Sequence, residues 1–426
     1  MLKHLKLHNV GPSQAMELEF GKRMNLITGD NGLGKSFLLD IAWWSLTRKW
    51  PAEINSKLTA GKKALPTGKD AASIGFSFNG LIKLEEYTSN YQRKEQAWTG
   101  SSGRPSNPGL VFYAMSDGSS AVWDPARNYW KTHEGIDIQD RIPAYVFTPS
   151  EVWDGLPGKD GKPLCNGLII DWAGWQKERG DPFNVLCAAL QVLSPSEKEP
   201  LKPGDLTRIS LDDARDMPTI RMPYGEDIAI VHASSGMRRI FALAYLLVWS
   251  WEEHKKASIL SGEDPASQII FLIDEVESHL HPQWQRQIIP ALLSVVKKLT
   301  EKAEVQIITA THSPLIMASV EPLFDSKQDA WFDLDLEDKK VVLRQRDFEK
   351  HGEAAKWLIS EAFDQKSGRA LEYEQLVEEA SLLLEIDNPE IEQIEKMNGK
   401  LVTALSPIDD FLFSWRYICK QKGWLK

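Results

Sequence analysis

One eight-residue segment, Gly29–Ser36, constrains the fold of this chain more than any other. Its sequence, GDNGLGKS, matches the phosphate-binding loop pattern G-x-x-x-x-G-K-[ST] at every fixed position. The preceding apolar stretch, Met24–Thr28, predicts a strand, and the following one, Phe37–Leu46, predicts a helix. Such a loop points consecutive backbone N–H groups into one concavity, and the helix adds the positive end of its dipole. The segment therefore predicts a nucleoside triphosphate site, with a chance glycine-rich turn as the alternative.

Each part of this loop has an expected role. The Lys35 ammonium would reach the β- and γ-phosphates, and the Ser36 hydroxyl would be a ligand of Mg²⁺. The predicted nucleotide-binding residues of the loop and of the helix start are Gly29, Asp30, Asn31, Gly32, Leu33, Gly34, Lys35, Ser36 and Phe37.

Length and composition limit the kind of protein. At 426 residues the chain exceeds one typical domain, so we expect a large α/β core with an added lobe. A net charge of −10 excludes a basic clamp over the whole molecule, so a DNA contact would need a local basic face. The three cysteines lie far apart without metal-ligand spacing, which favours a reducing cytoplasm over disulfides or structural zinc.

No segment predicts membrane insertion or export. Met1–Val10 mixes apolar residues with lysine and histidine, which predicts a strand rather than a signal peptide. The longest apolar run without a charge, Ile240–Trp251, is too short to span a bilayer and predicts a buried helix. We therefore expect a soluble cytoplasmic protein with no membrane partner.

Four regions are expected along the chain. Residues 1–48 and 144–325 would form one discontinuous nucleotide-binding core. Residues 49–143 predict an inserted antiparallel β-rich lobe, because Gly, Ser, Asn and Pro clusters separate short runs there. Residues 326–346 predict a β-hairpin, and residues 347–426 predict an acidic, amphipathic helical tail. No long heptad stretch occurs.

The strongest core signals alternate between helix and strand. Gly236–Trp251 and His281–Leu299 predict helices, whereas Gln268–Ile273 and Val305–Ala310 predict buried strands. Continuous apolar strands between helices indicate a parallel sheet that is covered on both faces. The predicted fold class is therefore α/β: a P-loop NTPase with a mixed or parallel sheet flanked by helices.

Two acids and a histidine follow the two buried strands. Asp274 and Glu275 end the first strand, at the edge where ligands bind in open α/β sheets. We expect Asp274 to complete the Mg²⁺ shell with Ser36, and Glu275 to activate the attacking water as a general base. His312 follows the next strand, where a γ-phosphate sensor belongs. The alternatives are acids that begin a helix and a histidine that caps one or lies in the core.

A shorter signal, Ala233–Gly236, precedes the long apolar helix. Serine and glycine at a helix start predict an N-cap and a close backbone approach, which together form an anion site. An ordinary N-cap is the alternative for this segment.

In chain order, these four pieces resemble the ABC-type ATPase heads of the SMC, RecF and OLD-like proteins. The run Asp274–Pro282, DEVESHLHP, is similar to the acid pair and D-loop of OLD-like ATPases of bacterial anti-phage defence systems, as are Trp284 and Gln285 after it. Thr311–Pro314 matches the switch of that group. The resemblance covers residues 1–48 and 144–325, and it implies an ABC-type ATPase core.

The resemblance also implies a slow, Mg²⁺-dependent ATPase that forms a head-to-tail homodimer or higher homo-oligomer. Ser234 and Gly236 of one chain would contact the γ-phosphate held by another, with Ser235 between them in the same binding set. Ala233 and Ser235 stand at positions that are often Leu and Gly in the family, which leaves the details of closure open.

Family members also carry a glutamine that touches Mg²⁺ and the attacking water. Gln176 is the candidate metal-site glutamine here, and Gln139 and Gln191 are the alternatives between the same two motifs.

Three kinds of head compete. In an ABC transporter subunit, loop and signature share a compact domain, whereas a large insert separates them here. An SMC head needs coiled-coil arms, which are absent, although a short RecF-like arm for DNA repair remains open. OLD nucleases fuse a Toprim domain, but Asp333 and Asp335 lie in a predicted hairpin and are expected to be exposed acids. We therefore expect a defence ATPase that controls a separate nuclease of HNH or Toprim type.

Overall fold

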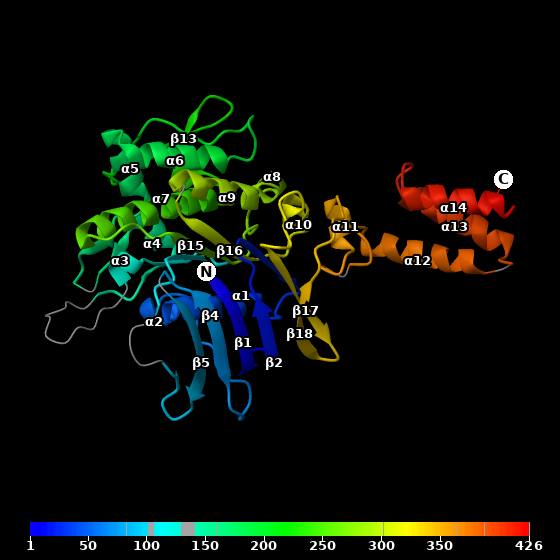
Figure 1. Cartoon of the computed structure of the whole chain (residues 1–426). Coiled ribbons are helices and arrows are strands. Elements are labelled where there is room, and N and C mark those ends of the chain that lie inside the picture. Colours follow the sequence, from blue (N-terminus) through cyan, green and yellow to red (C-terminus); the bar gives the residue numbers. More distant parts are fainter. Residues whose placement is uncertain are drawn as a thin grey trace. The chain divides into compact units, whose positions relative to one another are not determined.

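The computed structural model describes residues 1–81, 83–100, 106–128, 141–158, 160–300, 302–363, 365–386 and 388–425. The chain divides into two compact units, Met1–Ala354 and Ala355–Lys426. Figure 1 traces their elements along the chain. Within the described residues, every helix is too short or too polar to cross a membrane.

The first unit is built on an eight-stranded mixed sheet of order β18-β17-β3-β16-β15-β7-β8-β9. The parallel strands at its centre are β17 (Ala330–Glu337), β3 (Met24–Gly29), β16 (Glu304–Ala310), β15 (Gln268–Ile273) and β7 (Leu110–Ala114). The antiparallel strands at its edges are β18 (Lys340–Arg346), β8 (Ser120–Trp123) and β9 (Tyr145–Phe147). This sheet confirms the predicted α/β class with a mixed sheet.

The register of the central strands brings three predicted motifs to one edge of the sheet. β3 pairs with β16 so that Ile27 lies opposite Ala310, and β15 ends level with β16. The phosphate loop, the acid pair and His312 directly follow these three strands. Because the carboxyl ends of parallel strands share one edge, the three motifs converge there.

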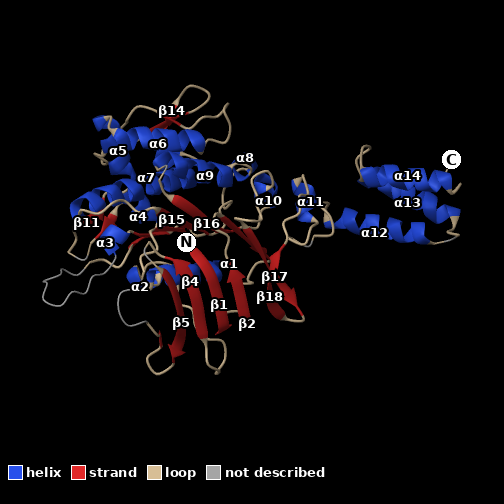
Figure 2. Ribbon diagram, in the orientation of Figure 1, coloured by secondary structure: helices blue, strands red, loops and turns tan. Residues whose placement is uncertain are grey.

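Helices and a second sheet cover the two faces of the main sheet (Figure 2). On one face, α1 (Lys35–Thr47) packs between the central strands and an antiparallel sheet of order β2-β1-β4-β5-β6, and all three layers share one apolar core. On the other face, Phe112 and Ile273 line a small cavity together with Ile240 and Leu243 of α7 (Ser235–Ser261). The phosphate-loop helix and the signature helix thus lie on opposite faces.

The remaining elements of this unit are short. The antiparallel sheet consists of β1 (Leu2–Val10), β2 (Ser13–Glu19), β4 (Ser73–Asn79), β5 (Leu84–Gln92) and β6 (Ala97–Trp98). Two smaller sheets comprise β10 (Leu156–Pro157) with β11 (Pro163–Cys165), and β12 (Lys202–Pro203) with β13 (Thr219–Arg221) and β14 (Asp227–Ala229). The other helices are α2 (Pro51–Ile54), α3 (Pro125–Asn128), α4 (Pro149–Asp154), α5 (Leu168–Glu178), α6 (Asp181–Val192), the 3₁₀ helix Ile230–His232, α8 (Pro282–Gln285), α9 (Ile288–Leu299) and α10 (Pro314–Val320).

The region predicted as an insert, residues 49–143, differs from that expectation in its described part. Strands β4, β5 and β6 extend the sheet that β1 and β2 begin, whereas β7 and β8 belong to the main sheet. The sequence therefore predicted that this region contains strands. It did not predict that these strands belong to sheets shared with the rest of the unit. Local alternation predicts that a segment is a strand, but it does not say which strand will pair with it.

The predicted helix His281–Leu299 is two helices, α8 and α9, in the structure. His281 is the N-cap of α8, where its Nδ1 accepts a hydrogen bond from the Gln283 N–H at 3.4 Å. Arg286 and Gln287 separate the two helices, and Gln287, with a φ of −127° and a ψ of −15°, lies outside the helical region. The break lies outside the apolar periodicity of α9, so the pattern alone could not locate it.

The acids of the β17–β18 hairpin correct the expectation that both are exposed. Asp333 is fully buried because β17 lies inside the sheet, between β3 and β18. Its carboxylate accepts hydrogen bonds from Thr28 Oγ1 at 2.7 Å and from the Arg346 guanidinium at 3.2 Å. Burial nevertheless raises the pKa of Asp333 from 3.8 to about 6. Asp335 is half-buried and binds Arg346 at 2.8 Å.

The raised pKa of Asp333 predicts a pH-dependent stability. The folded protein binds this proton more tightly than the unfolded chain, so the free energy of unfolding falls as pH rises from about 4 to about 6. The contribution is up to about 3 kcal/mol. Asp333→Asn should remove this slope, whereas Asp338→Asn, in the exposed turn of the same hairpin, should keep it. Urea titrations across this pH range measure it, and parallel curves for parent and Asp333→Asn would contradict it.

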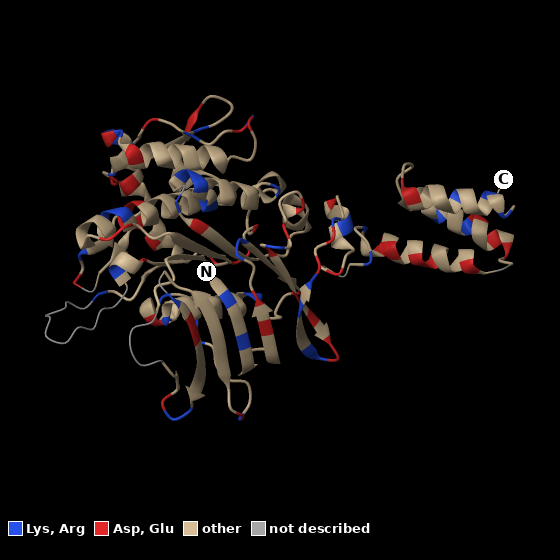
Figure 3. Cartoon of the chain, viewed as in Figure 1, with Lys and Arg blue, Asp and Glu red and all other residues tan. Residues whose placement is uncertain are grey.

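The second unit is a helical module. Its helices α12 (Leu371–Glu385), α13 (Ile391–Ala404) and α14 (Asp410–Gln421) follow α11 (Ala354–Leu358), which begins at the boundary between the units. They enclose an apolar core around Ile394, Leu401 and Trp415. Glutamates recur along α12 (Figure 3), so this helix of the module is acidic.

Candidate functional site

The phosphate loop joins β3 to α1 through backbone conformations that favour glycine. Gly29 has a φ of 126°, and a Cβ there would lie 2.3 Å from the Leu334 carbonyl oxygen of β17. Gly34 has a φ of 105°, and a Cβ there would lie 2.9 Å from the Pro12 side chain in the β1–β2 turn. Since other residues rarely adopt these φ values, the two glycines fit the loop between its neighbours.

Lys35 lies folded against this loop. Its Nζ donates to the carbonyl oxygens of Gly29 at 2.7 Å and Asp30 at 2.8 Å. Burial lowers the pKa of the Lys35 ammonium to about 8, although the carboxylates of Asp274 and Glu275 oppose the shift. The lysine and both acids of the pair therefore share one site, as the strand register predicts.

Asp274 fits a divalent cation. Its backbone N–H donates to the Ala114 carbonyl oxygen at 2.8 Å, which fixes it at the sheet edge. The hydroxyls of Ser36 and Ser116 lie next to its carboxylate, yet its buried Oδ1 has no hydrogen-bond partner among the described residues. Burial raises the pKa of Asp274. A buried carboxylate oxygen without a partner, next to a serine hydroxyl, is the donor set that Mg²⁺ takes in phosphate-loop proteins.

Glu275 holds a strained backbone position. Its φ of 48° lies in the left-handed region, which costs energy for a residue other than glycine. The turn is held by the Ser278 N–H, which donates to the Glu275 carbonyl oxygen at 2.8 Å. Glu275 is half-buried. Strain of this kind concentrates at functional sites because the surrounding structure must maintain it.

The switch segment is held by Glu277, a residue that the sequence did not single out. Glu277 accepts the His312 N–H at 2.5 Å through Oε1 and the Thr311 hydroxyl at 2.9 Å through Oε2. Ser313 Oγ also donates to Gln285 Oε1 at 2.7 Å. The D-loop thus binds the switch within one chain. Glu277 lies two residues after Glu275, and only this spacing could have suggested its role.

The imidazole of His312 is half-buried beside Lys35. Burial first, and the Lys35 ammonium second, lower the pKa of His312 below its ordinary value of 6.5. The imidazole is therefore neutral at neutral pH, so it can offer either a donor or an acceptor to a phosphate or a water.

The signature segment caps α7 and faces solvent. Ser234 Oγ accepts the Met237 N–H at 3.3 Å, as expected of an N-cap. Ser234 and Ser235 are exposed, whereas Gly236 is buried. In the described part of the chain, neither serine side chain bonds to the phosphate loop. The structure therefore leaves both hydroxyls open to another molecule.

A second buried acid lies near the cation site. Asp40 is one turn beyond Ser36 on α1, and its Oδ1 accepts the Tyr113 hydroxyl at 2.8 Å. Burial raises the pKa of Asp40 to about 7, and the charge of Asp274 adds to the effect. Nothing in the sequence marked Asp40, because its significance comes from strands that are far away in the chain.

The structure does not bring the candidate glutamine to the site, which corrects the prediction for Gln176. Gln176 lies on α5, where its amide donates to the Gly204 carbonyl oxygen at 2.7 Å and accepts the Trp172 indole N–H at 3.2 Å. Both ends of the amide are therefore occupied. Gln191 is exposed on α6, and Gln139 lies outside the described residues. Ser116, which follows β7, occupies the place beside Asp274 instead.

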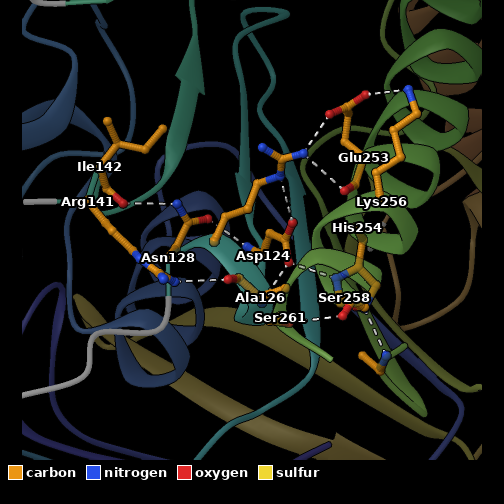
Figure 4. A network of polar contacts seen from close by, with 12 residues as sticks. Asp124, Ala126, Asn128, Arg141, Ile142, Glu253, His254, Lys256, Ser258 and Ser261 are labelled. Carbon is orange, nitrogen blue, oxygen red and sulfur yellow. Dashed lines mark hydrogen bonds and ion pairs between the residues drawn. The ribbon is translucent and has the colours of Figure 1, made fainter. Parts of the chain in front are cut away.

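A buried histidine–aspartate pair elsewhere is structural (Figure 4). His254 on α7 contacts Asp124 through Nδ1 at 2.7 Å, and its Nε2 accepts the Ala266 N–H at 2.8 Å. Because Nε2 is the acceptor, Nδ1 carries the proton and the ring has no free lone pair for catalysis. The pair fastens the second half of α7 to the end of β8.

These features define the class of protein. The chain belongs to the family described as AAA domain, putative AbiEii toxin, Type IV TA system, whose model matches residues 24–318. An AAA domain agrees with the class of ATPase that the order of its motifs predicted.

The chain is also similar to individual proteins and solved structures. The chain is 24% identical over 320 residues to the Septu protein PtuA of Bacillus thuringiensis, covering 74% of this chain and 72% of PtuA. It is 32% identical over 250 residues to the probable ATPase of retron Vc95 from Vibrio cholerae, covering 56% of this chain and 43% of that protein. Among solved structures, the SMC head domain from Thermotoga maritima aligns with 81% of this chain and 99% of its own, at 13% identity and a TM-score of 0.39.

Proposed function

We propose that this protein is a Mg²⁺-dependent ATPase whose heads pair head to tail and control a separate nuclease, of HNH or Toprim type, in bacterial anti-phage defence. The observation that carries the proposal is the half-complete site. Lys35, Asp274 and Glu275 converge at one edge of the sheet, whereas Ser234 and Ser235 remain exposed. Similarity to a Septu protein and to retron ATPases supports the role in defence.

In this mechanism the phosphate loop holds ATP through its backbone N–H groups. Lys35 leaves the loop carbonyls and binds the β- and γ-phosphates. Mg²⁺, held by Ser36 and Asp274, would neutralise charge that develops on these phosphates. Glu275 accepts a proton from the attacking water, and His312 contacts the γ-phosphate. Ser234 and Gly236 of the second chain close the site, and hydrolysis reopens it.

The acids of the hairpin support a separate effector. A Toprim-like metal site would need carboxylates that are free to bind a cation. Asp333 instead bonds to Thr28 and Arg346 inside the sheet, and Asp335 is paired with Arg344 and Arg346. This pair therefore offers no Toprim-like metal site, which supports our proposal that the nuclease is another polypeptide.

Mixing two inactive variants tests the shared site. Lys35→Ala removes the phosphate-loop cation, and Ser235→Glu places a carboxylate where the partner's γ-phosphate would lie. Ser235 is exposed at the start of α7, so a glutamate there is compatible with the helix dipole and with folding. In a head-to-tail dimer, each mixed pair has one site with both defects and one site with neither. Half of the dimers are mixed and each has one intact site, so an equimolar mixture should recover up to about one quarter of the parent ATPase activity.

The uncharged variant Ser235→Gln serves as the matched control, because it has the size of glutamate without the charge. It should retain more activity than Ser235→Glu if repulsion of a phosphate is the cause. A mixture as inactive as its two components would contradict a site completed in trans. Parent protein without ATPase activity would contradict the proposed function itself.

A further inference from the structure

Arg239 connects α7, the signature helix, to the acid loop of its own chain, which is the turn that begins with Asp274 and Glu275 after β15. It lies one turn into α7, and its guanidinium donates to three backbone carbonyl oxygens. These are Ser116 at 3.1 Å, Asp274 at 3.3 Å and Glu275 at 3.2 Å. All three belong to the ends of β7 and β15, where the cation site lies. A planar guanidinium with five donors can hold several carbonyls at once, which lysine cannot do.

A second contact joins the same two segments. A Cβ on Gly236 would lie 2.7 Å from the carbonyl oxygen of His279, so the start of α7 rests directly on the D-loop backbone. His279 has a φ of 63°, which is again a left-handed position for a residue other than glycine. The signature and the acid loop therefore touch through backbone at one point and through Arg239 at another.

The bonds from Arg239 act on the strained turn. Glu275 has a φ of 48°, and Arg239 binds its carbonyl oxygen and that of the residue before it. These two carbonyls belong to the peptide groups on either side of the Glu275 Cα, which set the direction of the Glu275 side chain. A shift of α7 would thus be passed to Glu275 through a few short contacts.

Both halves of α7 are held to the main sheet. Arg239 anchors its beginning at β7 and β15, and the His254–Asp124 pair anchors its second half at β8. The helix can therefore transmit a displacement of its start to these strand ends rather than absorb it.

We propose that Arg239 is a positioning residue that links the signature of each chain to its own Glu275, and so couples the two ATP sites of the dimer. The inference rests on the proposed function, because it needs the signature to touch the partner's ATP. When ATP in one site engages the signature of the other chain, Arg239 carries that contact to the acid loop of the second site. Each site thereby responds to occupancy of the other.

The test introduces Arg239→Lys into the mixed dimer described above. Its one intact site combines the phosphate loop of the Ser235→Glu chain with the signature of the Lys35→Ala chain. Arg239→Lys is added to either chain in turn, and the ATPase rate is measured. Only one site of this dimer binds ATP, so the substitution can act there only through the Glu275 of that site. A loss of about tenfold to a hundredfold, the scale of a misplaced catalytic group, is therefore expected from the Ser235→Glu chain. The Lys35→Ala chain, whose own Glu275 faces the empty site, should tolerate Arg239→Lys without loss. This pair of results isolates the positioning of Glu275, and the coupling is then measured in dimers with two intact sites.

Three further measurements complete the test. In the otherwise unaltered protein, Arg239→Lys should bring the Hill coefficient for ATP to 1 while equilibrium ATP affinity stays unchanged. Arg238→Gln, at the exposed neighbouring arginine, is the charge control and should keep the parent Hill coefficient. Gly236→Ala, which must displace the His279 carbonyl, should lower the coefficient as Arg239→Lys does, even if that variant folds poorly.

The outcomes separate this inference from the proposed function. A parent Hill coefficient of 1, or a parent-like coefficient in Arg239→Lys, would overturn the coupling. In each of these cases the mixed dimer would still be active. Only an inactive mixture, or an inactive parent, would overturn the shared ATP site itself.

Discussion

Replacement of Glu275 by glutamine is expected to slow ATP hydrolysis by about 10²–10⁴-fold, the contribution of a general base. Glutamine has the size of glutamate but cannot accept the proton of the attacking water. Because Lys35, Ser36 and Asp274 are untouched, the variant should bind Mg-ATP with nearly parental affinity. Single-turnover ATPase assays and equilibrium titration with a fluorescent ATP analogue measure the two quantities separately.

The same variant should accumulate as an ATP-bound dimer, since hydrolysis is the step that reopens the heads. Light scattering with and without Mg-ATP would detect it. Glu277→Gln is the matched control: it keeps one carbonyl acceptor for the His312 N–H or the Thr311 hydroxyl, so its loss of rate should be smaller. Parental hydrolysis by Glu275→Gln would show that another group is the base.

Local patterns were enough to predict the strands that form the site. The predicted strand Gln268–Ile273 is β15 to the residue, and the predicted strand Met24–Thr28 differs from β3 by one residue. Each is a short apolar run that ends at a glycine or an acid, and such boundaries are local. Because these strands alternate with helices along the chain, the sequence also predicted a parallel sheet. In such a sheet the three motifs lie at the carboxyl edge of the strands.

The sequence could not predict contacts between residues that are far apart in the chain. Asp333 was predicted to be exposed because its neighbours alternate, but β3 lies beside β17 and buries it. Glu277 matters because the turn after β15 brings it to the switch. Among the described residues, Arg239 bonds to backbone carbonyls alone, and backbone carbonyls carry no sequence signal.

The error with Gln176 has a different cause. The family pattern required a glutamine between two motifs, and several were available there. Sequence order alone could not tell which one follows a strand at the ligand edge. Gln176 lies instead in a helix, where Trp172 and Gly204 occupy its amide. Ser116, a residue type that the pattern did not seek, lies beside Asp274.

Replacement of Lys35 by alanine is expected to weaken ATP binding by about 10²-fold, the scale of losing one or two charged hydrogen bonds of about 1.5–3 kcal/mol each. The ammonium also bonds to the carbonyls of Gly29 and Asp30, but the rest of the loop is fixed by its neighbours. The variant should therefore fold, with a free energy of unfolding close to that of the parent. Titration with an ATP analogue at fixed Mg²⁺ measures the affinity.

Two matched variants separate the charge of this lysine from its position. Lys22→Ala removes an exposed lysine that lies two residues before the start of β3, and it should leave the affinity for ATP unchanged. Lys35→Arg keeps the charge, but a planar guanidinium does not fit a loop shaped around a compact ammonium, so most of the loss should persist. If Lys35→Ala bound ATP with full affinity, the phosphate loop would not be part of the ATP site. Recovery in Lys35→Arg would show that any positive charge suffices, and that the bonds to Gly29 and Asp30 do not shape the site.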